Sequence, residues 1–174
     1  MALDLSRTIS ITTEGKHREI HPAQVLLEHS TLRGIEAGAA FGMITSPLVA
    51  ILRKMNLVTA YRRGVPLYAC LGAAGTTAYI LYQYGMGHLD RAGVDRRARL
   101  ILENRSQMYV DSVSLKAGAA GAVYGALFCN RAIMSVASSS LTGIVLGVGY
   151  CYLDEKGYVD QGMKVVQETI SMRK

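Results

Sequence analysis

The sequence contains no tryptophan, two phenylalanines and three prolines, and only 18% of its 174 residues are charged. An ordinary soluble domain has about 25% charged residues, so this composition argues against an extensive solvated surface. The net charge is +6, but the basic residues lie at the ends of apolar runs. A nucleic-acid-binding face interleaves basic residues with aromatic or base-reading side chains. We therefore expect no nucleic-acid partner.

Cysteine is also scarce. Cys70, Cys129 and Cys151 all lie in apolar runs, and none belongs to a CxxC pair. An odd, dispersed set indicates no disulfide framework or zinc site. We expect three small buried thiols, with a membrane-embedded disulfide between two of them as the alternative.

Two histidines, His17 and His21, are four residues apart, so a helix could place them side by side as two ligands of one metal ion. No third ligand is evident, and we therefore predict no metal site.

Known catalytic and cofactor-binding motifs are missing too. The sequence contains no GxxxxGK[ST], GxSxG or HExxH, the patterns of phosphate-binding loops, hydrolases and zinc proteases. We therefore predict a protein that is not an enzyme and binds no cofactor.

The N-terminal segment carries acidic residues at Asp4, Glu14 and Glu19. A mitochondrial presequence is rich in arginine and poor in acids, and a secretory signal needs an uninterrupted apolar core. We therefore expect residues 1–33 to form a polar arm of the mature protein.

Long apolar runs dominate the rest of the chain. They cover residues 34–52, 64–86, 113–129 and 132–153. Crossing a membrane takes about 20 helical residues, and the third run qualifies if Lys116 extends to the interface. The runs are too long, and alternate too little, for strands of a membrane barrel. A soluble four-helix protein is the stronger alternative, but two of the runs offer no polar outer face.

The pattern predicts an all-α membrane protein with four transmembrane helices within residues 34–153. Only Asn130 and Arg131 separate the last two runs, so these should form a tight antiparallel hairpin.

Two amphipathic segments complete the chain. In the loop of residues 88–111 one helical face carries Val94, Ala98, Ile101 and Met108, and in the tail of residues 154–174 one face carries Val159, Met163, Val166 and Ile170. We expect each segment to pack on the rim of the protein or on a neighbour.

Small residues recur every fourth position in the apolar runs. In lipid, helices associate by close van der Waals packing, and small residues on one face let two backbones approach. This small-xxx-small pattern predicts helix-packing faces at Gly34, Gly38, Gly42, Gly72, Gly75, Gly121, Gly125, Gly143 and Gly147.

The loop between the first two runs, RKMNLVTAYRR (53–63), is strongly basic. It contains Arg53, Lys54, Arg62 and Arg63 and no acidic residue. Such a density of basic residues in a short loop predicts that the loop lies on the electrically negative side of the membrane. We expect these four residues to bind anionic phospholipid headgroups, such as those of cardiolipin.

Glu36 is the one carboxylate inside a predicted span, and an intramembrane charge is by default a candidate functional residue. Arg33 lies three residues earlier, so an i, i+3 ion pair or a carboxylate that extends to the interface is the favoured interpretation. Asp111 and Lys116 flank the start of the third run and are interpreted as boundary charges.

Three segments together resemble the mitochondrial inner-membrane translocase family, which comprises preprotein and amino-acid transporters. The matching segments are GIEAGAAFG (34–42), RKMNLVTAYRR (53–63) and AGAAGAVYG (117–125). The resemblance covers about residues 30–153. It implies four spans in the mitochondrial inner membrane, both termini in the intermembrane space and a basic matrix loop.

The sequence departs from the translocase members of that family. Those members carry an Arg four residues before an Asp ahead of the glycines of the third helix, whereas here Gln107 stands four residues before Asp111. The family also includes a divergent accessory subunit of respiratory complex I. The resemblance therefore implies a non-catalytic accessory subunit of the complex I membrane arm, which supports assembly and stability beside other membrane subunits. A component of a protein-import translocase or a related metabolite transporter is the alternative.

Overall fold

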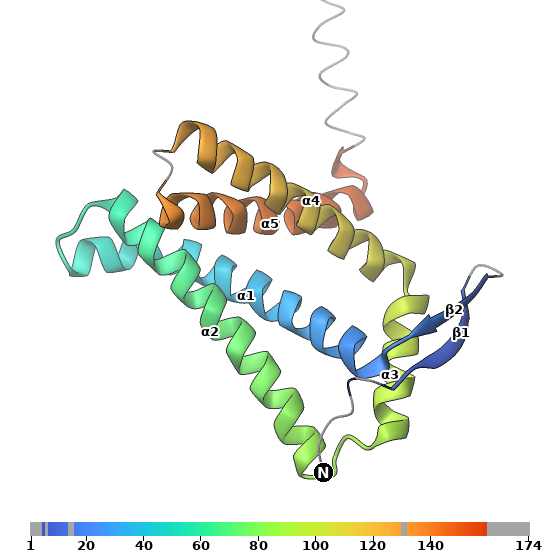
Figure 1. Ribbon diagram of the computed structural model, residues 1–174. Helices are drawn as coiled ribbons and strands as arrows, with labels where there is room; N and C mark the ends of the chain where they lie inside the picture. The colour runs from blue at the N-terminus through green and yellow to red at the C-terminus, as the bar shows by residue number, and fades with distance from the viewer. Residues whose placement is uncertain (1–4, 6, 14–15, 130–131, 160–174) are drawn as a thin grey trace, which may run out of the picture.

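The computed structural model describes residues 5, 7–13, 16–129 and 132–159. Within these residues the chain forms five helices and one β-hairpin (Figure 1). The helices are α1 (Pro22–Leu52), α2 (Leu57–Gly85), α3 (Arg91–Glu103), α4 (Arg105–Phe128) and α5 (Ile133–Glu155). The strands β1 (Ile9–Thr13) and β2 (Lys16–Ile20) pair antiparallel. The mostly helical architecture confirms the predicted class, and the β-hairpin is an addition that the sequence did not predict.

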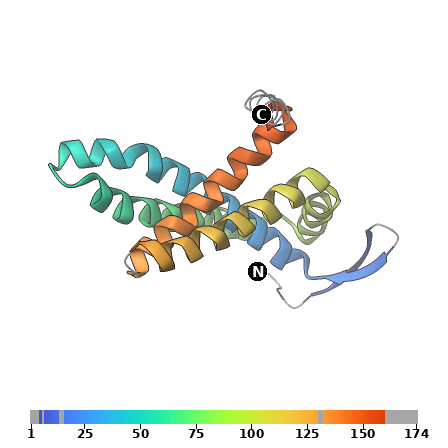
Figure 2. The same cartoon turned by 90° about the horizontal axis from the view of Figure 1, so that it is seen from above.

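The long helices form two hairpins, α1 with α2 and α4 with α5. Figure 1 shows the second hairpin above the first, and the view from above in Figure 2 shows that the two hairpins cross. The turn between α1 and α2 lies at the same end of the molecule as the last turn of α4 and the first turn of α5, and α3 lies at the opposite end. The predicted antiparallel pairing of the last two apolar runs is confirmed by the α4–α5 hairpin.

Helix boundaries extend beyond the apolar runs that predicted them. α1 begins at Pro22 and not at Gly34, and α2 begins at Leu57 and not at Gly64. A proline suits the first turn because the N–H that it lacks would have no partner within the helix. The segment of residues 1–33, predicted as a polar arm, is therefore divided between the β-hairpin and the first turns of α1.

Short polar side chains begin three of the helices. Asn56, Asp90 and Asn104 each accept a hydrogen bond from a backbone N–H in the first turn of α2, α3 and α4, at 2.8, 2.7 and 3.1 Å. Such caps satisfy donors that have no intrahelical acceptor. Asn104 also divides the predicted amphipathic loop helix, so Met108 lies in α4 and not on the face of α3.

Within the described residues, three helices are long and apolar enough to cross a membrane: α1, α2 and α5. At 1.5 Å per residue, α1 is about 46 Å long, close to the roughly 40–45 Å thickness of a bilayer with its headgroups. Less than a third of the apolar segment of each helix is buried inside the protein. Large apolar side chains face outward, among them Leu48, Leu67, Leu71 and Leu146. This surface is that of a membrane protein. The fourth predicted span, residues 113–129, falls in α4, which is not among the three.

The interior, in contrast, is built from small residues. Ala39 and Ala69 are buried with Val65 between α1 and α2. Among the buried serines, Ser46 satisfies its hydroxyl on its own helix, where it donates to the carbonyl of Gly42 at 2.6 Å. Small side chains let the helix backbones approach, which is the basis of packing in lipid.

Helix α3 and the β-hairpin pack at the end opposite the two interhelical turns. Val94 and Ala98 of α3 are buried, against Leu26 of α1 and Ile20 of β2 respectively. An ion pair of 2.7 Å joins Arg7 to Asp95 of α3. The predicted amphipathic helix is therefore confirmed as a helix that packs on the protein's own rim. Of the predicted tail face only Val159 is described, and Met163, Val166 and Ile170 lie outside the described residues.

Candidate functional site

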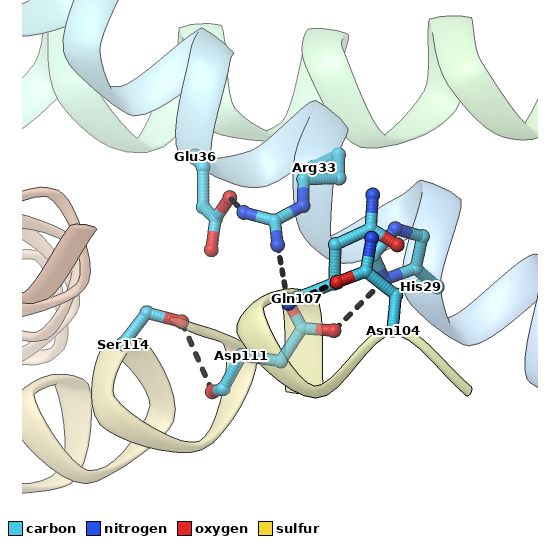
Figure 3. Close-up of polar contacts among 7 residues, drawn as sticks. All are labelled: His29, Arg33, Glu36, Asn104, Gln107, Asp111 and Ser114. Atoms are coloured by element: carbon cyan, nitrogen blue, oxygen red, sulfur yellow. Dashed lines mark hydrogen bonds and ion pairs between the residues drawn. The ribbon is translucent and has the colours of Figure 1, made fainter. Parts of the chain in front are cut away.

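Four charged or titratable side chains meet between the two hairpins, and we name them the charged cluster: His29, Arg33, Glu36 and Asp111 (Figure 3). Arg33 donates from Nη1 to Oε2 of Glu36 and from Nη2 to Oδ1 of Asp111, both at 2.5 Å. His29 Nδ1 lies 2.8 Å from Oδ2 of Asp111. One guanidinium thus holds a carboxylate from each hairpin.

The carboxylates of the charged cluster are largely buried, so the charges around them affect stability. The side chain of Glu36 is 8% exposed, that of Asp111 15% and that of Arg33 32%. Oε1 of Glu36 is buried, and among the described residues it has no hydrogen-bond partner. The cluster thus places two largely buried carboxylates beside one guanidinium and one imidazole. Burying carboxylates in a low-dielectric setting is costly unless they are paired, and such a group of charges marks a candidate site.

Local sequence explains how the cluster forms. His29, Arg33 and Glu36 follow at intervals of four and three residues, which places them on one face of α1. Asp111 lies in the second turn of α4. The hydroxyl of Ser114 donates to the backbone carbonyl of Asp111 at 3.1 Å. The two helices therefore present the groups to each other.

The predicted i, i+3 pair between Arg33 and Glu36 is confirmed. The interpretation of Asp111 as a boundary charge was incomplete, because it pairs with Arg33 and His29 across 78 and 82 residues. The spacing of His29, Arg33 and Glu36 in the sequence could have indicated a polar face on α1. Nothing in the sequence indicated the partner on α4. Lys116 is exposed on α4.

Most of the predicted packing glycines lie where helix backbones meet. An added Cβ at Gly42 would lie 2.8 Å from Cα of Val65, and at Gly125 it would lie 2.9 Å from Cα of Val136. These positions have no room for a side chain. The same holds at Gly34, Gly38 and Gly72 between α1 and α2, and at Gly121, Gly143 and Gly147 between α4 and α5.

Gly75 differs from the other glycines. A Cβ there would meet no atom of the described residues within 4 Å. The prediction of a packing role for Gly75 therefore requires correction within this chain: Gly72, three residues earlier, occupies the α1–α2 contact, and Gly75 points away from it.

The predicted lipid-binding residues lie in and next to the turn between α1 and α2. Arg53 and Lys54 follow α1, and Lys54 adopts a left-handed conformation with φ 49° that turns the chain. Arg62 and Arg63 lie in α2 itself and not in a loop. Arg53, Lys54 and Arg63 are exposed, and Arg62 is half-buried.

The cysteines and histidines are dispersed. All three cysteines are free thiols, but only Cys151 is buried, whereas Cys129 is half-buried and Cys70 is exposed. The expectation of three buried thiols was therefore wrong for Cys70, which faces outward from α2.

His17 lies in β2 and His21 precedes α1, so the two histidines share no helix. Among the described residues no group of three potential ligands could hold a metal ion.

Comparison with known proteins gives one match. The sequence model of a family described as "Protein of unknown function (DUF1757)" matches residues 13–156. No curated protein and no solved structure matches the chain.

Proposed function

The chain belongs to the DUF1757 family, and from the geometry above we propose that it is a non-catalytic subunit of a larger inner-membrane assembly. The assembly that the sequence resemblance favours is the membrane arm of respiratory complex I. In this role the protein supports assembly and stability by packing against other membrane subunits.

One observation carries the proposal: the helices meet at glycines, at backbone distance, while the large apolar side chains face outward. A Cβ at Gly147 would lie 2.9 Å from Cα of Ser114, whereas Leu146 next to it is exposed. Small-xxx-small faces of this kind hold helices together in lipid. They give a rigid body whose outer surface is free to contact lipid and neighbouring subunits.

We propose that α4 is the fourth span. It pairs along α5, which is long and apolar enough to cross the membrane, so both helices of this hairpin share one environment. Lys116 is exposed on α4, and its long aliphatic stem can carry the ammonium to the interface. Four spans place both termini on one side, and the resemblance favours the intermembrane space.

The end of the molecule that carries the α1–α2 turn, which we name the basic end, then faces the matrix. Its basic residues are Arg53, Lys54, Arg62 and Arg63, and no acidic residue lies between positions 53 and 63. Each basic group near an anionic membrane contributes about 1 kcal/mol. Cardiolipin and other anionic phospholipids are the lipids that suit this end.

Native electrophoresis of mitochondria solubilised in mild detergent tests the proposal. We expect the tagged chain to migrate with complex I, and its depletion to reduce the amount of the assembled complex. Migration of the chain in a particle without complex I subunits, with complex I unaffected by depletion, contradicts the assignment to complex I.

A component of a protein-import translocase or a metabolite transporter is the second candidate. It is favoured by the charged cluster, since Glu36 lies in a helix long enough to span the membrane and its Oε1 has no partner among the described residues. Intramembrane charges commonly mark a pathway for ions or polar substrates. Capture of arrested precursors in a smaller complex favours import, and conductance of the purified protein in planar bilayers favours transport.

A further inference from the structure

Two open grooves meet beside the charged cluster. One, of about 700 Å³, and the other, of about 580 Å³, are both lined by residues of α1, α3 and α4. His29 and Ile101 line both, so the two grooves adjoin, and we name them together the α3 groove. Helix α3, which lines it, lies at the end of the molecule opposite the turn between α1 and α2 (Figure 1).

The α3 groove has its charged residues at one end, its mouth near α3, where apolar side chains such as Leu27 and Leu100 also line it. Farther along α1 and α4 the lining includes Leu32, Ile35 and Leu115. If the long helices cross the bilayer, as proposed above, the polar mouth lies at headgroup depth and the apolar walls at acyl-chain depth.

The mouth carries charges of both signs. Arg97 of α3 contributes a guanidinium, while Glu28 of α1 and Glu103 of α3 contribute carboxylates, and all three side chains are exposed. A guanidinium binds phosphate through charge-assisted hydrogen bonds, and a carboxylate accepts hydrogen bonds from an ammonium group. The pattern is complementary to a zwitterion that carries both groups.

From this complementarity we infer that the α3 groove binds phosphatidylethanolamine. Its phosphate contacts Arg97, its primary ammonium contacts Glu28 or Glu103, and one acyl chain lies over Leu32 and Leu115. Anionic phospholipids are disfavoured because one arginine shares the mouth with two glutamates. Phosphatidylcholine is disfavoured because its quaternary ammonium has no N–H to donate.

The absence of tryptophan from the chain allows a direct test. Leu115→Trp introduces a single indole into the apolar part of the groove, and Leu71→Trp introduces one on the outer face of α2, away from it. The two leucines are 55% and 57% exposed, so they form a matched pair. Each full-length variant is reconstituted with brominated phosphatidylethanolamine, phosphatidylcholine or phosphatidylglycerol at equal mole fraction, and the quenching of tryptophan fluorescence is measured.

We expect the brominated ethanolamine lipid to quench Leu115→Trp with about a tenfold higher apparent affinity than the other two lipids, a difference of about 1.4 kcal/mol. Leu71→Trp should be quenched equally by all three. Adding Arg97→Glu to Leu115→Trp should abolish the preference. Adding Arg96→Glu, which alters an exposed residue outside the groove, should preserve it.

The inference rests on the proposed membrane location. The control variant Leu71→Trp distinguishes a failure of the lipid site from a failure of the membrane location. Equal quenching of both tryptophan variants by all lipids overturns the lipid site while the membrane location stands. A preference for phosphatidylglycerol, or a preference that survives Arg97→Glu, overturns it as well. If no lipid quenches even Leu71→Trp, both the lipid site and the membrane location are overturned.

Discussion

Arg33 on α1 and Asp111 on α4 form an ion pair, with Nη2 2.5 Å from Oδ1, although 78 residues separate them in the chain. The same guanidinium binds Glu36 on its own helix. Because α1 and α4 belong to different hairpins, this contact joins the two halves of the molecule at the end where α3 packs. The long-range polar contact complements the glycine contacts, which act within each hairpin.

Replacing Arg33 by methionine should destabilise the protein. The substitution leaves the carboxylates of Glu36 and Asp111 partly buried without their cation, which costs more than the intact pair contributes. Since Arg33 is about a third exposed, we expect a loss of about 1–3 kcal/mol, below the roughly 3–5 kcal/mol of a fully buried pair. The free energy of unfolding, measured by SDS titration in mixed micelles, checks this.

Arg63→Met is the matched control, because Arg63 is exposed at the opposite end of the molecule. Arg33→Lys should recover part of the stability, since an ammonium keeps the charge but lacks the fork that binds two carboxylates. Equal stability of Arg33→Met and Arg63→Met would show that the ion pair contributes nothing to joining the hairpins.

Leucine at two of the contact glycines should separate the helices. Gly38 faces the backbone of Tyr68, and Gly121 faces that of Ser139, so a branched side chain cannot fit without displacing a helix. We expect Gly38→Leu and Gly121→Leu each to cost about 1–3 kcal/mol or more, with a lower yield of folded protein in detergent by size-exclusion chromatography.

Gly75→Leu is the control within the same helix pair. It adds the same side chain to the partner helix α2, but at a position that is open among the described residues. Its yield and stability should stay close to those of the unmodified protein. If Gly75→Leu is as damaging as Gly38→Leu, then the loss of a glycine from the helix, and not a steric clash, is the cause.

These contrasts indicate what the sequence could predict. The pair of Arg33 and Glu36 is local, because a helix brings residues three apart onto one face, and it was predicted. The pairing with Asp111 depends on how two hairpins cross, and no local pattern encodes that angle. The periodicity of small residues predicts packing faces on α1, α4 and α5, and it cannot tell which of Gly72 and Gly75 points at the partner helix.

The N-terminal segment is a second case in which local sequence did not predict a structure that depends on tertiary contacts. Ile9 pairs opposite Ile20 in a β-hairpin, yet the segment between them is rich in polar residues and was interpreted only as part of a polar arm. Ile20 is buried against Ala98 of α3. The tertiary contact with α3 therefore stabilises strands whose own sequence gives only a weak signal.

Thiol reactivity should follow the position of each cysteine relative to protein and detergent. Cys151 is buried in α5, Cys129 is half-buried at the end of α4 and Cys70 is exposed on α2, midway along a helix apolar enough to span the membrane. In detergent micelles we expect single-cysteine variants to react fastest with a small maleimide at Cys129, slowly at Cys70, where surrounding hydrocarbon disfavours the thiolate, and at Cys151 only after unfolding. Mass spectrometry over time measures the three rates, and rapid labelling of Cys151 in the folded protein would contradict the packing of α5 against its neighbours.

Anionic lipid should stabilise the protein through the basic end. Arg53, Lys54 and Arg63 are exposed together, and no acidic residue lies between positions 53 and 63. Replacing all three by glutamine removes attraction of about 1 kcal/mol per charge near an anionic surface. Because a ligand that binds the folded state raises its stability, we expect cardiolipin to raise the melting temperature of the unmodified protein much more than that of the triple variant.

A second triple variant, with glutamine at Arg91, Arg96 and Arg99 of α3, removes the same charge from the opposite end. Those arginines are also exposed, but Asp90, Asp95 and Glu103 lie on or beside the same helix. Nearby carboxylates oppose the approach of an anionic headgroup, so this variant should keep most of the cardiolipin response. If both triple variants lose the response equally, the attraction depends on the net charge of the protein and not on the residues at the hairpin turn.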